Sequence, residues 1–160
     1  MLEAKKIADS LFRQIRDALD DRTILIGIRD GGSVVLDYLI NQLDVDVIAA
    51  SVDVSFYRDD FEIRGLAKSK QSTSIDVDIN GRHVILVDDV VQSGRTARAA
   101  VNELFDFGRP QTVRLAVLVD RGGRELPIEP QFVGGLVEIP KDQKIEVRLD
   151  ESGGLVIDVD

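Results

Sequence analysis

The sequence contains no cysteine and only one histidine, His83. Without cysteine, disulfide frameworks, thiolate metal sites and thiol nucleophiles are excluded. His83 opens a strongly apolar segment, and we interpret it as a structural residue, which argues against histidine-dependent catalysis and a histidine metal site. No apolar run approaches the length of a membrane span, and the N-terminus lacks the apolar core of a signal peptide. We therefore expect a cytoplasmic protein with no membrane partner.

The overall composition is typical of one soluble globular domain. The 160 residues include 44% hydrophobic and 31% charged side chains, and a chain of this size can build a substantial core. We expect a single domain over residues 1–160. The formal net charge is −9. Because binding to a phosphate backbone needs a concentrated positive face, this charge argues against broad nonspecific affinity for nucleic acids.

The stretch from His83 to Ala100 has the organisation of a ligand site. An unbroken aliphatic run over Val84–Val87 is typical of a strand buried on both faces of a parallel sheet. Two carboxylates, Asp88 and Asp89, follow this run. They are predicted at the carboxyl end of the strand, where open α/β sheets bind ligands, and they suit vicinal hydroxyls or a metal ion.

A turn of small residues comes next, with the sequence Gln92-Ser93-Gly94-Arg95-Thr96, and it opens a helical pattern through Phe105. Gly94 lets a ligand approach the backbone closely, and the exposed N–H groups and dipole of a helix start favour an anion. The hydroxyl groups of Ser93 and Thr96 are additional donors. The turn therefore predicts a phosphate cradle directly after the two carboxylates.

Other glycine motifs do not match this sequence. It has no Gly-x-x-x-x-Gly-Lys-Ser/Thr segment, and Gly27, Gly31 and Gly32 do not form Gly-x-Gly-x-x-Gly, so neither a nucleotide P-loop nor a dinucleotide fingerprint is supported. The simplest alternative for residues 83–100 is an ordinary strand-to-helix turn with two solvated acids, and the pattern by itself leaves that alternative open.

The remaining segments predict an α/β fold with a central, mostly parallel sheet flanked by helices. From residue 62 to residue 80 the apolar periodicity disappears, and a loop of this length is typical of a lid or a disordered segment. A glycine pair in residues 29–32 gives a second loop whose N–H groups suit an anion. Helices are predicted over residues 3–20 and 34–43, strands over 23–28, 45–54 and 112–119, and a closing hairpin over 145–149 and 155–159.

Residues 83–100 closely resemble the phosphoribosyl pyrophosphate (PRPP) signature of type I phosphoribosyltransferases, with strand, paired acids, turn and helix in the same order. Residues 54–60, Val-Ser-Phe-Tyr-Arg-Asp-Asp, resemble one branch of this family, the pyrimidine operon attenuation regulators that are also uracil phosphoribosyltransferases. The resemblance extends from Thr23 to Leu149. It implies the type I phosphoribosyltransferase fold, with a flexible lid at residues 55–82 and a small hood at residues 120–140.

The resemblance also implies an activity and the residues that perform it. The phosphoribosyl group would pass from PRPP to uracil, giving uridine monophosphate (UMP) and pyrophosphate. The implied catalytic residues are Arg58, a cationic clamp on the diphosphate, and Asp88 and Asp89. The cofactor is Mg2+, held at the two aspartates mainly through the substrate. The implied PRPP-binding residues are Arg29, Asp30, Gly31, Gly32, Asp88, Asp89, Val90, Val91, Gln92, Ser93, Gly94, Arg95 and Thr96.

Base binding is assigned by the same resemblance to Phe132, Val133 and Gly134. Phe132 and Val133 could equally fill a small satellite core, and the sequence does not separate these alternatives. Gln92 occupies a place where purine-using relatives have a carboxylate, which favours a pyrimidine base. Asp30 departs from the family, which usually has a threonine there. A carboxylate facing pyrophosphate is unfavourable unless it turns away or helps to hold magnesium.

The second function that the resemblance leaves open is that of a UMP-sensing regulator, which binds a leader RNA hairpin and has weak or no enzymatic activity. The net charge argues against it, as does Gly123, which replaces a histidine of the RNA-binding members. We also expect a homo-oligomer, a dimer or larger. The candidate RNA face consists of Arg121, Arg124, Lys141, Lys144 and Arg148.

Overall fold

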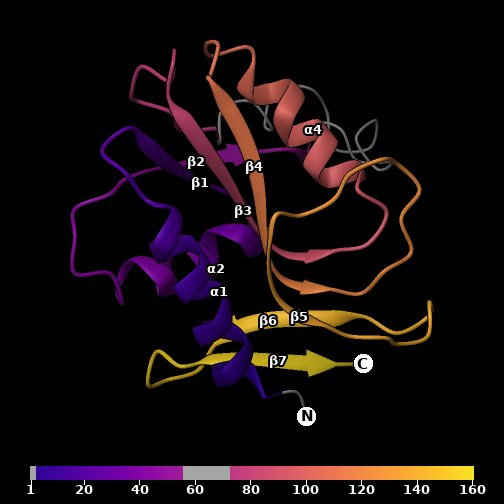
Figure 1. The fold of residues 1–160 in the computed structure, drawn as a ribbon. Coiled ribbons are helices and arrows are strands. Elements are labelled where there is room, and N and C mark those ends of the chain that lie inside the picture. Colours follow the sequence, from indigo (N-terminus) through magenta and orange to yellow (C-terminus); the bar gives the residue numbers. More distant parts are fainter. Residues whose placement is uncertain (1–2, 56–72) are drawn as a thin grey trace.

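The computed structural model describes residues 3–55 and 73–160, and a five-stranded parallel sheet forms their centre (Figure 1). In space the strands follow the order β2-β1-β3-β4-β5, and every neighbouring pair is parallel. A separate antiparallel pair, β6 and β7, completes the chain. The strands are β1 (Thr23–Arg29), β2 (Ile48–Asp53), β3 (His83–Val91), β4 (Thr112–Asp120), β5 (Phe132–Leu136), β6 (Ile145–Leu149) and β7 (Leu155–Val159).

Helices cover both faces of the sheet (Figure 1). On one face, α1 (Ala4–Ala18) and α2 (Gly31–Ile40) share a hydrophobic cluster with the β6–β7 hairpin. On the other face, α4 (Arg95–Leu104) packs through its alanines and Leu104. Because both faces are covered, the strands have continuous apolar runs, and the predicted α/β fold is confirmed. Among the described helices, none has the length and apolar character that a membrane crossing requires.

Several element boundaries differ from the prediction by a few residues, and two of these differences bear on the site. Helix α2 begins at Gly31, three residues before the predicted start, so that the glycine pair belongs to its first turn. Strand β3 continues to Val91 because it keeps pairing with β4, with Asp88 opposite Val117 and Val90 opposite Val119. The two aspartates therefore lie within the last residues of the strand and not beyond its end.

The last part of the predicted lid contacts β2 and the cluster beneath α4. Ser74 exchanges two backbone hydrogen bonds with Ser51 of β2, at 3.0 and 2.9 Å. Ile79 is fully buried in the cluster beneath α4. Residues 75, 77 and 79 therefore pack against the edge of the sheet, whereas residues 74, 76, 78 and 80 are exposed, and the lid over residues 55–82 stays a prediction. The rest of the lid, including Arg58, lies outside the described residues.

The strand order places a topological switch point between β1 and β3. After β1 the chain moves outward to β2, and it then returns to form β3 on the opposite side of β1. In open α/β sheets, the connections that leave the carboxyl ends of two such strands diverge and leave a crevice for ligands. Arg29 ends β1, and Asp88 and Asp89 lie near the end of β3. The predicted anion loop and the carboxylate pair thus both lie near this switch point.

Gly134 of β5 gives a test of the packing between the sheet and α1. A Cβ at this position would lie 2.5 Å from the Leu118 carbonyl oxygen and 2.8 Å from that of Ile7, whereas at Gly135 it would meet only the side chain of Ile7, at 3.1 Å. We expect Gly134→Ala to lower the free energy of unfolding by about 1–3 kcal/mol, as overpacking does. Gly135→Ala, the control, should change it by less than about 1 kcal/mol. Urea unfolding measures both, and equal stabilities would contradict this account of the β5–α1 contact.

Candidate active site

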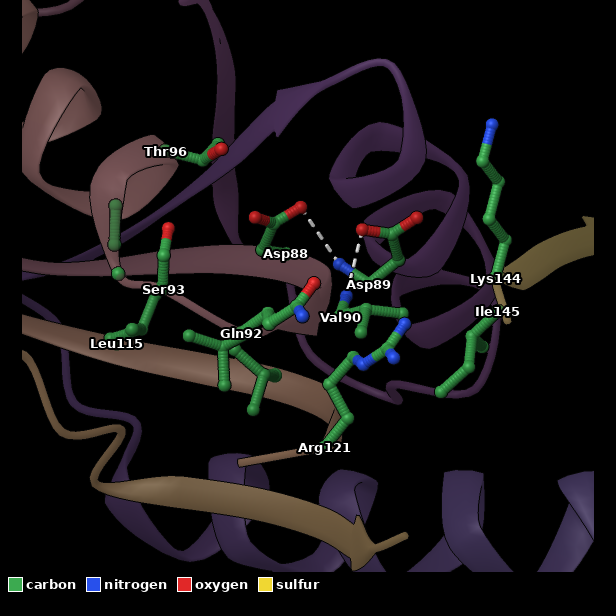
Figure 2. A pocket seen from close by; sticks show the side chains of 14 residues that line it. Asp88, Asp89, Val90, Gln92, Ser93, Thr96, Leu115, Arg121, Lys144 and Ile145 are labelled. Atoms are coloured by element: carbon green, nitrogen blue, oxygen red, sulfur yellow. Dashed lines mark hydrogen bonds between the residues drawn. The ribbon is translucent and has the colours of Figure 1, made fainter. Parts of the chain in front are cut away.

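A cleft of about 350 Å³ opens at the carboxyl end of β3 (Figure 2). It brings together most of the contiguous stretch that the sequence singles out, from Asp88 to Gly94 and Thr96, with side chains from β4 and from the start of β6. The residues that line it are Asp88, Asp89, Val90, Val91, Gln92, Ser93, Gly94, Thr96, Ala97, Leu115, Val117, Arg121, Lys144 and Ile145.

Backbone hydrogen bonds orient the two carboxylates in the cleft (Figure 2). One oxygen of Asp88 accepts a bond of 2.9 Å from the N–H of Asp89, and one oxygen of Asp89 accepts a bond of 2.7 Å from the N–H of Val90. Asp88 is only 7% exposed. Because each carboxylate bonds to the next backbone N–H, both are fixed relative to the strand and not only by their own rotamers.

The predicted phosphate cradle forms the turn between β3 and α4. Gly94 has a φ of +91°, a conformation that favours glycine, and it caps the start of α4. The Ser93 hydroxyl oxygen accepts a bond of 3.2 Å from the N–H of Arg95. The first N–H groups of the ten-residue helix α4 therefore adjoin the cleft, with Ser93 and Thr96 in its lining. Arg95 lies outside the lining, and its side chain pairs with Glu125 at 3.7 Å.

Residues 124–126 in the connection after β4 form a brace, which holds the backbone of this cradle in place through hydrogen bonds. Arg124 donates a bond of 3.1 Å to the carbonyl oxygen of Gln92. The N–H groups of Glu125 and Leu126 donate to the carbonyl oxygen of Ser93, at 2.9 and 3.1 Å. Because these two carbonyl groups accept hydrogen bonds from residues 124–126, their partial negative charges are directed toward those residues.

An ion pair anchors the brace. Arg124 bonds to both carboxylate oxygens of Asp120, at 3.0 and 2.6 Å, and also pairs with Glu129 at 3.2 Å. Burial alone would raise the pKa of Asp120, but hydrogen bonds from Arg124 and from the N–H of Gly122, together with the charge of Arg124, bring that pKa below its usual range. The hydrogen bond to Asp120 also raises the pKa of Arg124. Both partners stay ionised at neutral pH.

The glycine pair of the second anion loop lies against β3. A Cβ at Gly31 would collide with the carboxylate of Asp89, and one at Gly32 would collide with the carbonyl oxygen of Val87. The start of α2 is therefore pressed against the strand that carries both aspartates, although residues 29–32 do not line the cleft themselves. The Asp30 side chain is 96% exposed and lies 3.8 Å from Arg29, so its carboxylate turns toward solvent.

The predicted base-binding residues are not brought into this cleft. Phe132, Val133 and Gly134 belong to β5 at the edge of the sheet. The backbone of Val133 exchanges bonds of 2.7 and 3.1 Å with the side chain of Gln14 in α1. The Arg114 guanidinium lies 5.2 Å from the centre of the Phe132 ring. These are packing contacts, and contact of the three residues with a base stays a prediction.

The five residues of the candidate RNA face have different surroundings. Arg121 and Lys144 line the cleft. Arg124 belongs to the brace, and Arg148 pairs with an acidic side chain of β7 at 3.1 Å. Lys141 is exposed in the turn before β6.

Six residues that line the cleft are not assigned to the active site by the sequence, and Lys144 and Ile145 are two of them. Lys144 was assigned to the candidate RNA face and Ile145 only to a hairpin strand. No local motif marks them, because they reach the cleft through the packing of β6 against α2. Leu115 and Val117 of β4 also line the cleft. Leu115 and Val117 are two residues apart on β4 and therefore lie on the same face of the sheet, and Val117 is opposite Asp88. This spacing is a sequence signal that could have placed both residues in the cleft.

Comparison with known proteins agrees with this geometry. A carboxylate pair on a strand, followed by an anion cradle at a switch point, is the arrangement that the phosphoribosyltransferase signature predicts. The structure is similar to a hypoxanthine-guanine phosphoribosyltransferase from Bacillus anthracis, with a TM-score of 0.69 and 24% identity, covering 89% of this chain and 84% of that one. The family described as phosphoribosyl transferase domain matches residues 1–151. The predicted enzyme class and fold are confirmed.

Relatives with higher sequence identity show the branch of the family to which the chain belongs. The bifunctional protein PyrR from Pseudomonas aeruginosa is 40% identical over 142 residues, which are 89% of this chain and 84% of the relative. The bifunctional protein PyrR 1 from Lactiplantibacillus plantarum is 46% identical over 138 residues, covering 82% of this chain and 76% of the relative. The chain belongs to the PyrR family of phosphoribosyltransferases.

The Asp120–Arg124 pair predicts a pH-dependent stability. Asp120→Asn should lower the free energy of unfolding at neutral pH by about 1–3 kcal/mol, because a largely buried arginine loses the nearer of its two charged partners. The pKa of Asp120 is lower in the folded than in the unfolded state. Its contribution is therefore present above the unfolded value of about 3.9 and is lost as the pH falls through the folded value. Below about pH 4, the difference from wild type should shrink.

Urea unfolding from neutral to acid pH measures this effect. Asp158→Asn is the matched control, because it breaks the more exposed pair with Arg148, and it should cost only about 0–1 kcal/mol. Equal losses in the two variants, or a difference that does not shrink in acid, would contradict the proposed anchor.

Proposed function

We propose that this protein transfers the phosphoribosyl group of PRPP to uracil, with UMP and pyrophosphate as products, and that the cleft at the end of β3 is its active site. The observation that carries the proposal is the placement of the Asp88–Asp89 pair beside the α4 cradle in one cleft. PRPP has both features that this arrangement suits, a ribose with vicinal hydroxyls and a terminal phosphate. Membership of the PyrR family supports the same activity.

In this proposal the contiguous residues hold the sugar part of the donor. Asp88 and Asp89, oriented by their backbone bonds, accept hydrogen bonds from the ribose hydroxyls. The N–H groups at the start of α4 and the hydroxyls of Ser93 and Thr96 hold the 5-phosphate. Because the anomeric carbon loses pyrophosphate with oxocarbenium character, fixing the ribose in place supplies much of the catalysis.

The diphosphate would lie toward the start of α2, whose first turn is pressed against Asp89. Its N–H groups can receive an anion, and Asp30 does not oppose it because its carboxylate faces solvent. Arg58 would add a positive charge, as the family resemblance implies. Mg2+ fits the donor set, since magnesium is commonly bound by one or two carboxylates together with substrate phosphates. When bound, it would neutralise the diphosphate as it leaves.

A pyrimidine is the proposed acceptor because of Gln92. It lines the cleft at the place where purine-using relatives have a carboxylate, and it is exposed there. An amide offers both a donor and an acceptor to a ring with carbonyl and N–H groups, without a formal charge.

The test combines a panel of bases with a variant of the carboxylate pair. Wild-type protein given labelled PRPP and uracil, orotate, hypoxanthine or guanine should form product chiefly with uracil. Asp88→Asn with Asp89→Asn should reduce turnover by at least about 100-fold, because the ribose loses both charged acceptors. The fold should persist, since like-charge repulsion is relieved. The control, Asp44→Asn with Asp46→Asn, changes the charge equally on an exposed surface. Near-wild-type turnover in the Asp88/Asp89 variant would end the ribose assignment.

RNA binding is the second function to consider, because relatives of this chain are named bifunctional. We propose that it is weak here. The five basic candidates do not form one free surface, since Arg124 and Arg148 are engaged in ion pairs and Arg121 and Lys144 line the cleft. The net charge of −9 adds long-range repulsion of a polyanion.

A gel-shift titration tests this proposal. The probe is the leader RNA of the protein's own pyrimidine operon, at near-physiological salt with UMP and Mg2+ present, and a shuffled leader is the control. Each missing charge-assisted contact costs about 1 kcal/mol or more, so we expect no better than the micromolar affinity of nonspecific binding, on the order of 10⁻⁶ M. Nanomolar binding of the true leader alone would make regulation the primary function.

A further inference from the structure

The end of the cleft away from the phosphate cradle combines cations with aliphatic side chains. Figure 2 shows Lys144 and Ile145 on the far side of the carboxylates from the cradle, and the Arg121 side chain reaching toward Val90. Val90 completes this end of the lining. Aliphatic walls with a few directed polar groups suit a flat ring better than they suit a diphosphate.

The backbone at Lys144 is held on both sides. Its N–H donates to the carbonyl oxygen of Asp160 at 3.0 Å, and its carbonyl oxygen accepts from the N–H of Asp160 at 2.9 Å. Arg121 donates to the carbonyl oxygens of Gln143 and Pro140, at 2.9 and 3.0 Å. The guanidinium therefore fastens the turn before β6 to the end of β4. Lys144 therefore lines the cleft from an anchored backbone position, and its side chain is exposed there.

Transfer to uracil requires the loss of a ring proton, and a cation at this end of the cleft can assist that loss. Its N1 carries a proton that must leave when N1 bonds to ribose. The single histidine lies at the start of β3, where its Nδ1 is 2.7 Å from the Thr112 hydroxyl, and the cleft is at the other end of that strand. Asp88 and Asp89 are assigned to the ribose. Loss of the N1 proton spreads negative charge over the carbonyl oxygens of the ring, and a nearby cation stabilises that charge.

We propose that the Lys144 ammonium group donates to a carbonyl oxygen of uracil and stabilises its anionic form in the transition state, with Arg121 as the positioning residue. This inference rests on the proposed function. In the step, the N1–H bond breaks and the N1 electron pair forms the bond to C1′. The electrons of the C1′–O bond leave with diphosphate, which takes up the proton from N1. Lys144 keeps its own protons throughout.

The test compares uracil with 5-fluorouracil, whose N1 proton is more acidic because fluorine withdraws electrons. In single-turnover experiments at saturating PRPP, Lys144→Met should slow transfer to uracil by about 100-fold, the loss typical of one donor to a developing anion. With 5-fluorouracil the loss should be less than about 10-fold, because less stabilisation is needed. Lys144→Arg, which keeps the cation, should recover a large part of the rate for both bases.

Two further variants separate position from charge. Arg121→Gln should slow transfer to uracil more than transfer to 5-fluorouracil, but by a smaller factor than Lys144→Met, because Arg121 acts only by placing Lys144. Lys141→Met removes an exposed ammonium group from the same turn and should transfer both bases at the wild-type rate. Circular dichroism and thermal unfolding confirm that each variant is folded.

Each outcome decides between the alternatives. A loss at Lys144→Met that is equal for the two bases would place Lys144 on the donor and overturn the inference, while the proposed function would stand. No loss at all would do the same. Wild-type protein that forms no UMP would overturn the proposed function and this inference with it.

Discussion

The close contact between the first turn of α2 and strand β3 is the constraint on which the site depends. A Cβ at Gly32 would strike the carbonyl oxygen of Val87, and one at Gly31 would strike the carboxylate of Asp89. A side chain at position 32 would therefore push the helix start away from the strand backbone, and one at position 31 would displace the carboxylate of Asp89. In the proposed site, the starts of α2 and α4 can both adjoin one carboxylate pair because these glycines leave room for the contact. A ligand with phosphate groups at both ends of a ribose needs this spacing.

The cradle on the other side of the carboxylates is prepared before a ligand arrives. A phosphate is repelled by carbonyl oxygens and attracted by N–H groups. The carbonyl oxygens of Gln92 and Ser93 are taken up by Arg124 and by the N–H groups of Glu125 and Leu126. Their dipoles are thereby fixed away from the anion, and the α4 N–H groups remain directed toward it. Preorganisation of this kind avoids the cost of reorienting dipoles during the reaction.

The sequence predicts the parts of the site that are contiguous in the chain. Residues 88–96 include carboxylates, turn and helix start in one stretch, so local chemistry suffices to place them. It does not predict that Arg124 braces the cradle or that Lys144 reaches the cleft, because both depend on how distant segments pack against the sheet. The packing of residues 75, 77 and 79 is not evident from the sequence for a related reason. Residues 75, 77 and 79 are apolar, but their burial depends on a sheet edge that they share with β2 and α4.

The distribution of charge explains how an acidic chain can bind an anionic donor. At physiological ionic strength, interactions between exposed charges are screened over about 8 Å, so the net charge of −9 has little effect inside the cleft. In the proposed site, binding of the donor depends on local groups, which are the N–H groups at the starts of α2 and α4. An RNA hairpin instead spans many screening lengths and needs a continuous row of free cations, whereas Arg95, Arg124 and Arg148 are each paired with carboxylates. Phosphoribosyl transfer and RNA binding therefore make separate demands on the charges of this fold, and the described residues meet those of transfer.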